Sequence, residues 1–308
     1  MAMVMINRFA SGLIGASIIS FFLFSCEDVV HPTLESAVPV LVVDAWITNQ
    51  PGPQLIKLNQ SQGYFDNTLP TGLSGAVVNV TDDQGKIYAF NEDDKNAGNY
   101  LWKPIASEVF GSVGRKYKLS IQVSGVNFES TSAMGRVPKI DSITFDTEKR
   151  IGSSDSTTRG QFWATDPVGI GDAYWIRTFK NGISLSKPSE INVAFDAGFS
   201  AGGETDGVDF ITPIRRGINP NDKDAAGKTL SPFQKGDSVN VQIHSISLAA
   251  FNYLNEVAIQ TDRPGGFQEL FATPLANVST NIASTGGNRV LGFFNVAAVS
   301  SAGKRFKK

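Results

Sequence analysis

Cysteine and histidine are nearly missing from this chain. Its 308 residues include one cysteine and two histidines, and charged residues make up only 18%. A single cysteine excludes an intrachain disulfide framework, and so few histidines leave carboxylates as the main candidate metal ligands. The formal net charge of −2 comes without the basic patch that a nucleic-acid-binding protein needs. We therefore expect no nucleic-acid partner, no metal and no cofactor.

Catalytic motifs are also lacking. The sequence has no HExxH, no CxxC and no phosphate-binding loop of the Walker type. His244 follows the alternating run 239–243 and is expected on the opposite face of that strand, as a surface or hydrogen-bonded interface histidine. Acid–base chemistry would have to come from carboxylates such as Asp206 and Asp209. We predict that the chain is not an enzyme.

The amino terminus has the pattern of a secretion signal. Arg8 is the only charged residue before Glu27, and residues 9–24 are apolar or small. A short positive region followed by an apolar run is typical of a secretory signal, and the run falls short of the ~20 residues that span a bilayer. The alternatives are a lipoprotein signal, an ordinary cleaved signal and an uncleaved anchor helix.

The end of that run resembles a lipoprotein processing site. Leu23-Phe24-Ser25-Cys26 is similar to the lipobox of bacterial lipoproteins, which implies a signal peptide over residues 1–25 and a lipid on the Cys26 thiol. Glu27 and Asp28 resemble the export signals of surface lipoproteins in Bacteroidetes. Two or more acyl chains, at ~0.8 kcal/mol per buried CH₂, anchor a protein stably. We expect a body exposed outside the outer membrane on a tether, residues 26–39.

Strand patterns begin at residue 40. Runs rich in β-branched and apolar residues alternate with turn signals, and Gly85 lies in a predicted hairpin turn. Apolar and polar residues alternate strictly over 117–123, which indicates a strand with one buried face. Residues 40–138 are therefore predicted to form an immunoglobulin- or transthyretin-like β-sandwich.

A second β-rich domain with one helix is predicted over residues 139–300. Strand-like runs resume after Pro138, and a Gly-, Asp- and Pro-rich region fills 196–237. One amphipathic helix is expected near 246–260, with Ser245 or Ser247 as its cap. Residues 301–308 form a basic tail that we read as a solvated terminus. The expected fold class is thus mostly β.

Two sets of side chains are candidate ligand-binding groups. The first set is four tryptophans in or beside predicted strands, Trp46, Trp102, Trp163 and Trp175. They are read as core residues, and one on a loop rim would be able to stack on a sugar. The second set is a run of oxygen ligands that faintly resembles a calcium loop, Asn219, Asn221, Asp222 and Asp224. It lacks the glycine and the distal glutamate of such loops, so no metal site is predicted there.

Several segments in order resemble the DUF4249 lipoproteins of Bacteroidetes. They are Val42–Thr48, Gly75–Val78, Gly114–Leu119, Pro138–Ser142, Asp166-Pro167, Pro274–Ile282 and Val290–Phe294. The pattern departs at Ala173, where a polar residue is expected. The family has no assigned catalytic residues. Its members resemble outer-membrane lipoproteins that are often encoded beside TonB-dependent receptors, which implies a partner and not a reaction.

The expected function follows from these features. We predict a lipid-anchored binding or accessory protein of the outer membrane or cell surface, a partner of a TonB-dependent transporter in nutrient uptake. Its ligand is not specified by the sequence. The alternative is a surface adhesion or structural module in which β-sandwich domains act as spacers.

Overall fold

The chain folds as a mostly β protein, as the strand patterns predict. The computed structural model describes residues 38–63, 66–149, 156–200 and 203–307, and the body from Pro39 onward is one compact unit. Strands greatly outnumber helices in it. None of the helices in these ranges combines the length and the apolar character needed to span a bilayer.

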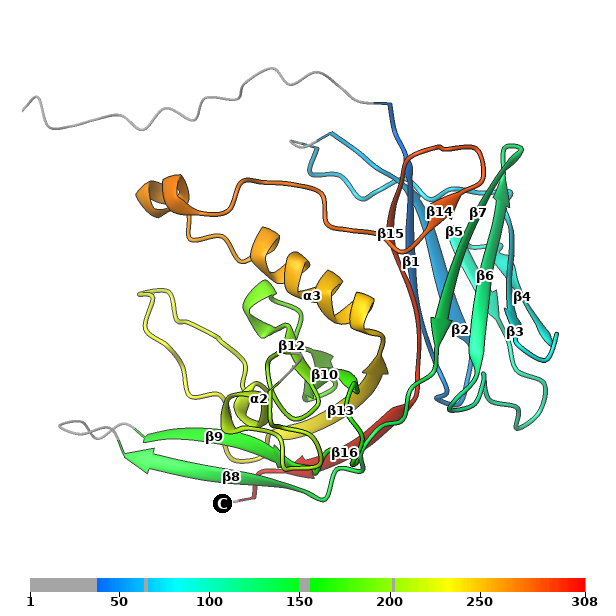
Figure 1. Cartoon of the computed structure of the whole chain (residues 1–308). Helices are drawn as coiled ribbons and strands as arrows, with labels where there is room; N and C mark the ends of the chain where they lie inside the picture. Colours follow the sequence, from blue (N-terminus) through cyan, green and yellow to red (C-terminus); the bar gives the residue numbers. More distant parts are fainter. Residues whose placement is uncertain (1–37, 64–65, 150–155, 201–202, 308) are drawn as a thin grey trace, which may run out of the picture. The chain divides into compact units, whose positions relative to one another are not determined.

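One large sheet contains nine strands from both ends of the chain (Figure 1). Its strand order is β14-β7-β6-β3-β4-β5-β2-β1-β15. The strands are β1 (Leu41–Thr48), β2 (Gln54–Gln60), β3 (Val77–Asp82), β4 (Ile87–Asp93), β5 (Asn96–Trp102), β6 (Lys116–Val123), β7 (Val126–Ala133), β14 (Ala283–Ser284) and β15 (Val290–Ala297). All neighbouring pairs are antiparallel except β1 and β15, which run parallel.

This sheet is nearly closed. Its two edge strands, β14 and β15, follow each other in the chain and are joined through residues 285–289. Side chains bridge the remaining gap between β7 and β15. The Val296 amide donates to Ser132 Oγ at 3.0 Å. Asn281, before β14, links the two strands by accepting from Ser130 Oγ at 2.8 Å and from the Phe294 amide at 3.0 Å. Closure matters because an open sheet edge leaves backbone groups unpaired.

The interior of the nine-stranded sheet is filled by the inward residues of its alternating strands. In β1, Val43, Ala45 and Ile47 are buried, whereas Asp44 and Trp46 between them face away from this core. Tyr117 of β6 and Phe110 in the loop before it are also fully buried. The period-2 pattern thus places one face of each strand in the core and leaves the other face for the surroundings.

A second sheet of five strands follows. It contains β10 (Ala173–Lys180), β11 (Ile183–Ser184), β12 (Asn192–Phe195), β13 (Ser238–Ile246) and β16 (Val299–Arg305), in the order β11-β10-β13-β16 with β12 on β10. Strands β8 (Ser142–Lys149) and β9 (Ser156–Trp163) form a separate antiparallel pair. Short helices complete this part: η1 (Pro188–Glu190), α2 (Thr212–Arg216) and η2 (Gly266–Phe271). A second core, to which β8 to β10, β12, β13 and α2 contribute, lies here.

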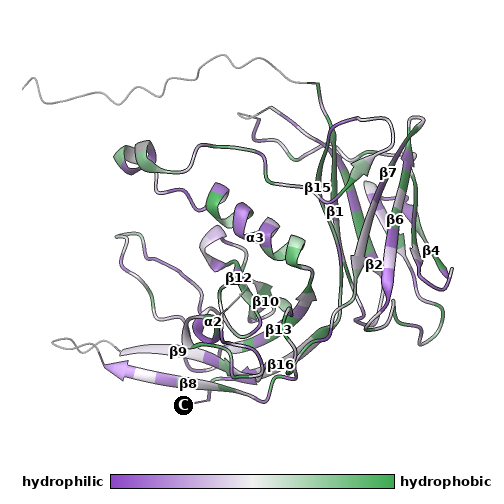
Figure 2. Ribbon diagram, viewed as in Figure 1, coloured by the Kyte–Doolittle hydropathy of each residue, from purple (hydrophilic) through white to green (hydrophobic). Residues whose placement is uncertain are grey.

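The main helix, α3 (Leu248–Thr261), lies where the helix near 246–260 was predicted. Ser247 caps it by accepting a hydrogen bond from the Ala250 amide at 3.1 Å, and Ser245 instead holds the Ala298 amide. Hydrophilic and hydrophobic stretches alternate along α3 in Figure 2. Its buried residues, Ala250, Phe251 and Leu254, pack with Phe293 of β15 in a third cluster that connects α3 to both sheets.

The carboxyl-terminal strands differ from the predicted arrangement. The run 289–299 is split, with β15 in the nine-stranded sheet and β16 in the five-stranded one. Much of the predicted basic tail, 301–308, lies in β16, whose Lys304 donates to the Ile143 carbonyl at 2.6 Å. The mostly β class is confirmed. The predicted β-sandwich over 40–138 followed by a separate β-rich domain is not confirmed, because β14 and β15 from the end of the chain belong to the first sheet.

Candidate functional site

A cleft of about 670 Å³ lies between the outer faces of β1 and β2 and of β10 and β13. Its walls carry two tryptophans, several charged side chains and a histidine. Those that matter below are Asp44, Trp46, Lys57, Trp175, Arg177, Gln242 and His244. A volume of this size is in the range of sites for small molecules.

Strand alternation explains how one wall forms. Val43, Ala45 and Ile47 of β1 enter the core of the nine-stranded sheet, so Asp44 and Trp46 must face outward into the cleft. The antiparallel register of β1 and β2 pairs Asp44 directly with Lys57. The wall therefore presents an acid and a base side by side, next to an indole.

The opposite wall forms in the same way. Residues of β10 alternate between the second core and the cleft, and Trp175 and Arg177 are on the cleft side. The register of β10 with β13 pairs Trp175 with His244 and Arg177 with Gln242. The positions of these four side chains on the cleft wall are thus set by the pairing of β10 with β13.

Aromatic rings connect the two walls. The ring centroids of Trp46 and Trp175 lie 5.1 Å apart in an edge-to-face arrangement, and Trp46 stacks on Phe293 at 5.7 Å. Tyr253 of α3 packs on Phe293 at 4.7 Å and supports this group from behind. Because such contacts are favourable beyond their buried area, this seam holds the cleft walls at a defined separation.

Arg177 is half-buried in the cleft without a polar partner. Its guanidinium lies 4.8 Å from the Trp175 ring centroid and 5.6 Å from that of Phe179. It makes no hydrogen bond or ion pair with any residue of the described ranges. Burial lowers the pKa of Arg177, and the field of Asp44 acts against that shift.

Asp44 has the complementary environment. Solvent reaches its side chain, yet protein surrounds it on several sides, as expected on the wall of a concave cleft. This partial burial raises the pKa of the Asp44 carboxyl, while Lys57 and Arg177 lower it. Within the part of the chain that the structure describes, Asp44 and Lys57 make no hydrogen bond or close ion pair.

His244 is almost fully buried at the inner end of the cleft. Burial, with the nearby charge of Arg177, lowers its pKa to about 3. The imidazole is therefore neutral at ordinary pH, and its Nε2–H donates to Gln242 Oε1 at 3.0 Å. The sequence-based reading of a hydrogen-bonded histidine on the face opposite Ile243 agrees with this position.

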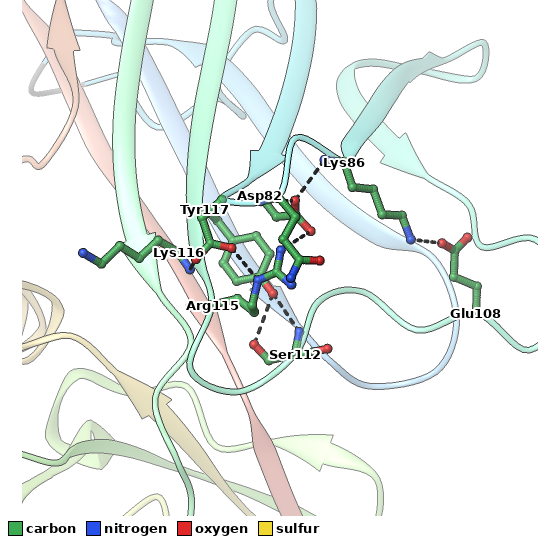
Figure 3. Close-up of polar contacts among 9 residues, drawn as sticks. Asp82, Lys86, Glu108, Ser112, Arg115, Lys116 and Tyr117 are labelled. Atoms are coloured by element: carbon green, nitrogen blue, oxygen red, sulfur yellow. Dashed lines mark hydrogen bonds and ion pairs between the residues drawn. The ribbon is translucent and has the colours of Figure 1, made fainter.

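A second hollow, of about 580 Å³, lies beside β6 and β7 near the start of α3. Its charged rim is mostly paired, with the ammonium of Lys116 as the exception among the described residues (Figure 3). Arg115 makes ion pairs with Asp82 at 3.1 Å and with Asp83, and the Ser112 amide donates to the Tyr117 hydroxyl at 2.7 Å. Because these groups satisfy one another, this hollow offers a ligand less unsatisfied polarity than the cleft does.

Three carboxylates outside both hollows are close enough to hold a cation. Oxygens of Asp166, Asp196 and Asp206 lie within 4.8 Å of one another. Internal donors already occupy them: Tyr174 donates to Asp166 at 2.6 Å, the Gly171 and Asp172 amides to Asp196, and the Gly169 amide to Asp206. Arg136 adds a positive charge by pairing with Asp172 at 2.7 Å. The three carboxylates therefore stabilise the surrounding loops through these hydrogen bonds.

The remaining sequence candidates lie elsewhere. Cys26, Glu27, Asp28 and His31 are outside the described residues. Of the calcium-like run, Asn219 bonds to the backbone of Gly160 and Arg216, Asp222 pairs with Lys187 at 2.5 Å, and Asp224 caps a turn. Asp209 accepts a bond from Thr165 at 2.6 Å. These side chains stabilise local loops.

The tryptophans divide into two kinds. Trp102 is part of the first core, and Trp163 donates to Thr144 Oγ1 at 3.1 Å. Trp46 and Trp175 line the cleft, and so do Asp44, Lys57 and Arg177, which the sequence reading did not select. Alternation in the runs 41–48 and 173–180 places these residues off the core face. No local pattern in the sequence predicts that the outer face of β1 and β2 lies opposite that of β10 and β13.

Comparison with known proteins gives a single assignment. The family model described as "Domain of unknown function (DUF4249)" matches residues 27–302. No curated protein matches the chain. The matched range includes both walls of the cleft and every strand from β1 to β15. The chain therefore belongs to the DUF4249 family.

Proposed function

We propose that this chain is a lipid-anchored binding protein of the bacterial outer membrane, with its body at the cell surface, that serves a TonB-dependent transporter in nutrient uptake. The binding role is supported by the cleft, and in particular by Arg177. The location and the partner are supported by the lipobox-like segment at Cys26 and by the family resemblance. No catalytic role is proposed.

Arg177 carries the binding proposal because it is a half-buried cation that faces the cleft and has no polar partner among the described residues. Its nitrogens are not fully buried, so water in the cleft solvates them, and a ligand with two acceptor oxygens would replace that water with charge-assisted hydrogen bonds. Other arginines of the described body show the usual solution: Arg136 bonds to Asp172 and Arg115 pairs with Asp82. Arg177 differs from these arginines because it has no such partner within the described ranges and lies beside two half-buried indoles. This difference indicates that the partner of Arg177 is an external ligand.

Loss of Trp175 is expected to weaken ligand binding at least about tenfold. The Trp175→Ala change removes aromatic contact area and the ring on which Arg177 lies. Binding is measured by tryptophan fluorescence titration of the full chain in mild detergent, with neutral and acidic trisaccharides and tripeptides as the panel. Trp163→Phe is the matched control, because Trp163 does not line the cleft. Failure of every panel member to saturate would favour the adhesion or structural alternative.

Lipidation is expected to depend on Cys26 alone. Expressed in a Gram-negative host with radiolabelled fatty acid, the wild-type chain should incorporate label and begin at an acylated Cys26 by mass spectrometry, because the thiol is its only site for thioether attachment. Cys26→Ser should abolish the label, and Ser25→Ala should retain it. An unmodified wild-type amino terminus would overturn the proposed location.

The proposed transporter partner has its own test. Under mild detergent, the lipoprotein should be recovered from native membranes together with a β-barrel protein. Recovery of the lipoprotein without any such protein would contradict the accessory role and leave the binding role to be judged by the cleft alone.

A further inference from the structure

The chemistry of Arg177 restricts the ligand of the cleft, if the proposed binding role holds. The guanidinium is held by ring contacts with Trp175 and Phe179 and keeps its N–H donors unpaired among the described residues. A planar guanidinium donates two parallel hydrogen bonds to a carboxylate, and such charge-assisted bonds are the strong ones. The ligand group that fits Arg177 is therefore an oxyanion, a carboxylate or a phosphate, and the charge of the cleft decides between them.

Charge balance in the cleft favours a carboxylate. Lys57 and Arg177 are cationic, Asp44 is anionic, and His244 is neutral because burial lowers its pKa to about 3. The lining thus has an excess of one positive charge, which a single ligand carboxylate neutralises. Asp44 remains available to accept hydrogen bonds from ligand hydroxyls, and the Gln242 amide NH₂, which has no partner in the described body, is available to donate.

Most of the backbone in the cleft walls is already paired. Strand β1 is paired with β15 along its whole length and with β2 over Leu41–Asp44, and β10 is paired with β13, β12 and β11. An extended peptide binds by adding a strand to a free sheet edge, and the edge strands β11, β14, β15 and β16 contribute none of the lining residues. This arrangement favours recognition by side chains, which suits a ligand that is rich in hydroxyls.

Flat aromatic surface completes the pattern. The half-buried indoles of Trp46 and Trp175 line the cleft beside the charged groups. One face of each indole is already covered, that of Trp46 by Phe293 and that of Trp175 by Arg177, so a sugar ring would place its polarised C–H groups against the other faces. A cleft of about 670 Å³ has room for a short oligosaccharide.

We infer that the cleft binds an acidic saccharide, whose carboxylate pairs with Arg177, whose ring lies against Trp46 and Trp175, and whose hydroxyls bond to Asp44 and Gln242. This inference deepens the proposed function by naming the ligand class. In this arrangement Arg177 makes the cleft prefer acidic over neutral sugars, and the two indoles contribute to the binding of both kinds.

Calorimetric titration of the full chain in mild detergent tests the inference with two probes, trigalacturonate with two of its three carboxyls methyl-esterified so that one charge remains, and neutral trigalactose. The acidic probe should bind at least about tenfold more tightly, because it alone can form a charge-assisted pair with Arg177, and added salt should reduce the difference. Arg177→Gln should remove the preference, so that the acidic probe binds no more tightly than trigalactose. Arg177→Lys should retain part of it, since the charge remains without the planar fork.

Arg215→Gln is the matched control. Arg215 also lies on a tryptophan, 3.8 Å from the Trp163 ring centroid, but it does not line the cleft, so its loss should leave both affinities unchanged. The wild-type comparison of the two probes stands even if Arg177→Gln fails to fold. Equal affinity for the two probes, or an undiminished preference in Arg177→Gln, overturns the acidic-saccharide assignment.

Peptides provide the remaining outcomes. Binding of a tripeptide with a free carboxyl terminus, without binding of its amidated form or of trigalacturonate, would overturn the saccharide class while the cleft remained a binding site. Saturable binding of trigalactose alone would likewise leave the proposed function intact. Absence of saturable binding by every probe would overturn the proposed function itself, so the two failures are distinguishable.

Discussion

Gly292→Ala should destabilise the fold by more than about 3 kcal/mol, the largest effect we expect from a single small substitution. Gly292 of β15 is paired with Val43 of β1 and has a φ of +95°, in a region that L-residues with a side chain avoid. An added Cβ would lie 1.9 Å from the Val43 carbonyl oxygen. Strain at this φ and a clash with backbone that cannot rotate away would both have to be relieved.

Gly287→Ala is the control that separates the two costs. Gly287 has a φ of +71°, but no atom lies within 4 Å of its added Cβ, so only about 1 kcal/mol of backbone strain is expected. Urea unfolding followed by circular dichroism gives both free energies of unfolding. If the two variants lose equal stability, β15 does not approach β1 as closely as the structure places it.

The contact between β1 and β15 matters for the cleft as well as for stability. β15 supplies Phe293, which stacks on Trp46 and contacts Tyr253 of α3. It also supplies Asn295, whose Oδ1 accepts from the Ser247 amide at 3.2 Å where α3 begins. One strand thus closes the nine-stranded sheet and supports the aromatic seam on which the cleft walls rest.

Local pattern in the sequence predicted individual elements well. Strict alternation over 117–123 corresponds to β6, and the apolar stripe near 246–260 corresponds to α3 with Ser247 as its cap. These elements follow from periods of 2 and 3.6 that buried faces impose. The mostly β class follows from them without knowledge of how the strands pair.

Long-range pairing was not predictable in the same way. Leu41 pairs with Val290 across almost the whole chain, and no residue in either run marks the partner. Only Ala298 separates β15 from β16, so one continuous strand-like run enters two sheets without a turn signal between them. The cleft depends on that arrangement. The sequence reading placed Trp46 and Trp175 in the core, whereas both line the cleft, and the meeting of the two strand faces was not predictable from either run.

Acid should destabilise the wild-type chain more steeply than a His244→Phe variant. The pKa of His244 is about 3 in the folded chain and 6.5 when the residue is free, with burial as the larger cause and Arg177 as the second. Between these values the unfolded chain binds a proton that the folded chain does not, so stability falls as pH falls. From pH 7 to pH 4.5 this linkage removes between about 2 and 3 kcal/mol.

The comparison of slopes isolates this effect from the titration of carboxylates, which both proteins share. Free energies of unfolding are measured by urea titration at intervals between pH 7 and 4.5. Over this range the wild-type chain should lose about 2 to 3 kcal/mol more stability than His244→Phe loses, whatever the difference between the two proteins at pH 7. Arg177→Gln should give an intermediate slope, because it removes the second cause and leaves burial in place. Parallel curves for wild type and His244→Phe would mean that the imidazole reaches water, and hence that the inner end of the cleft is open.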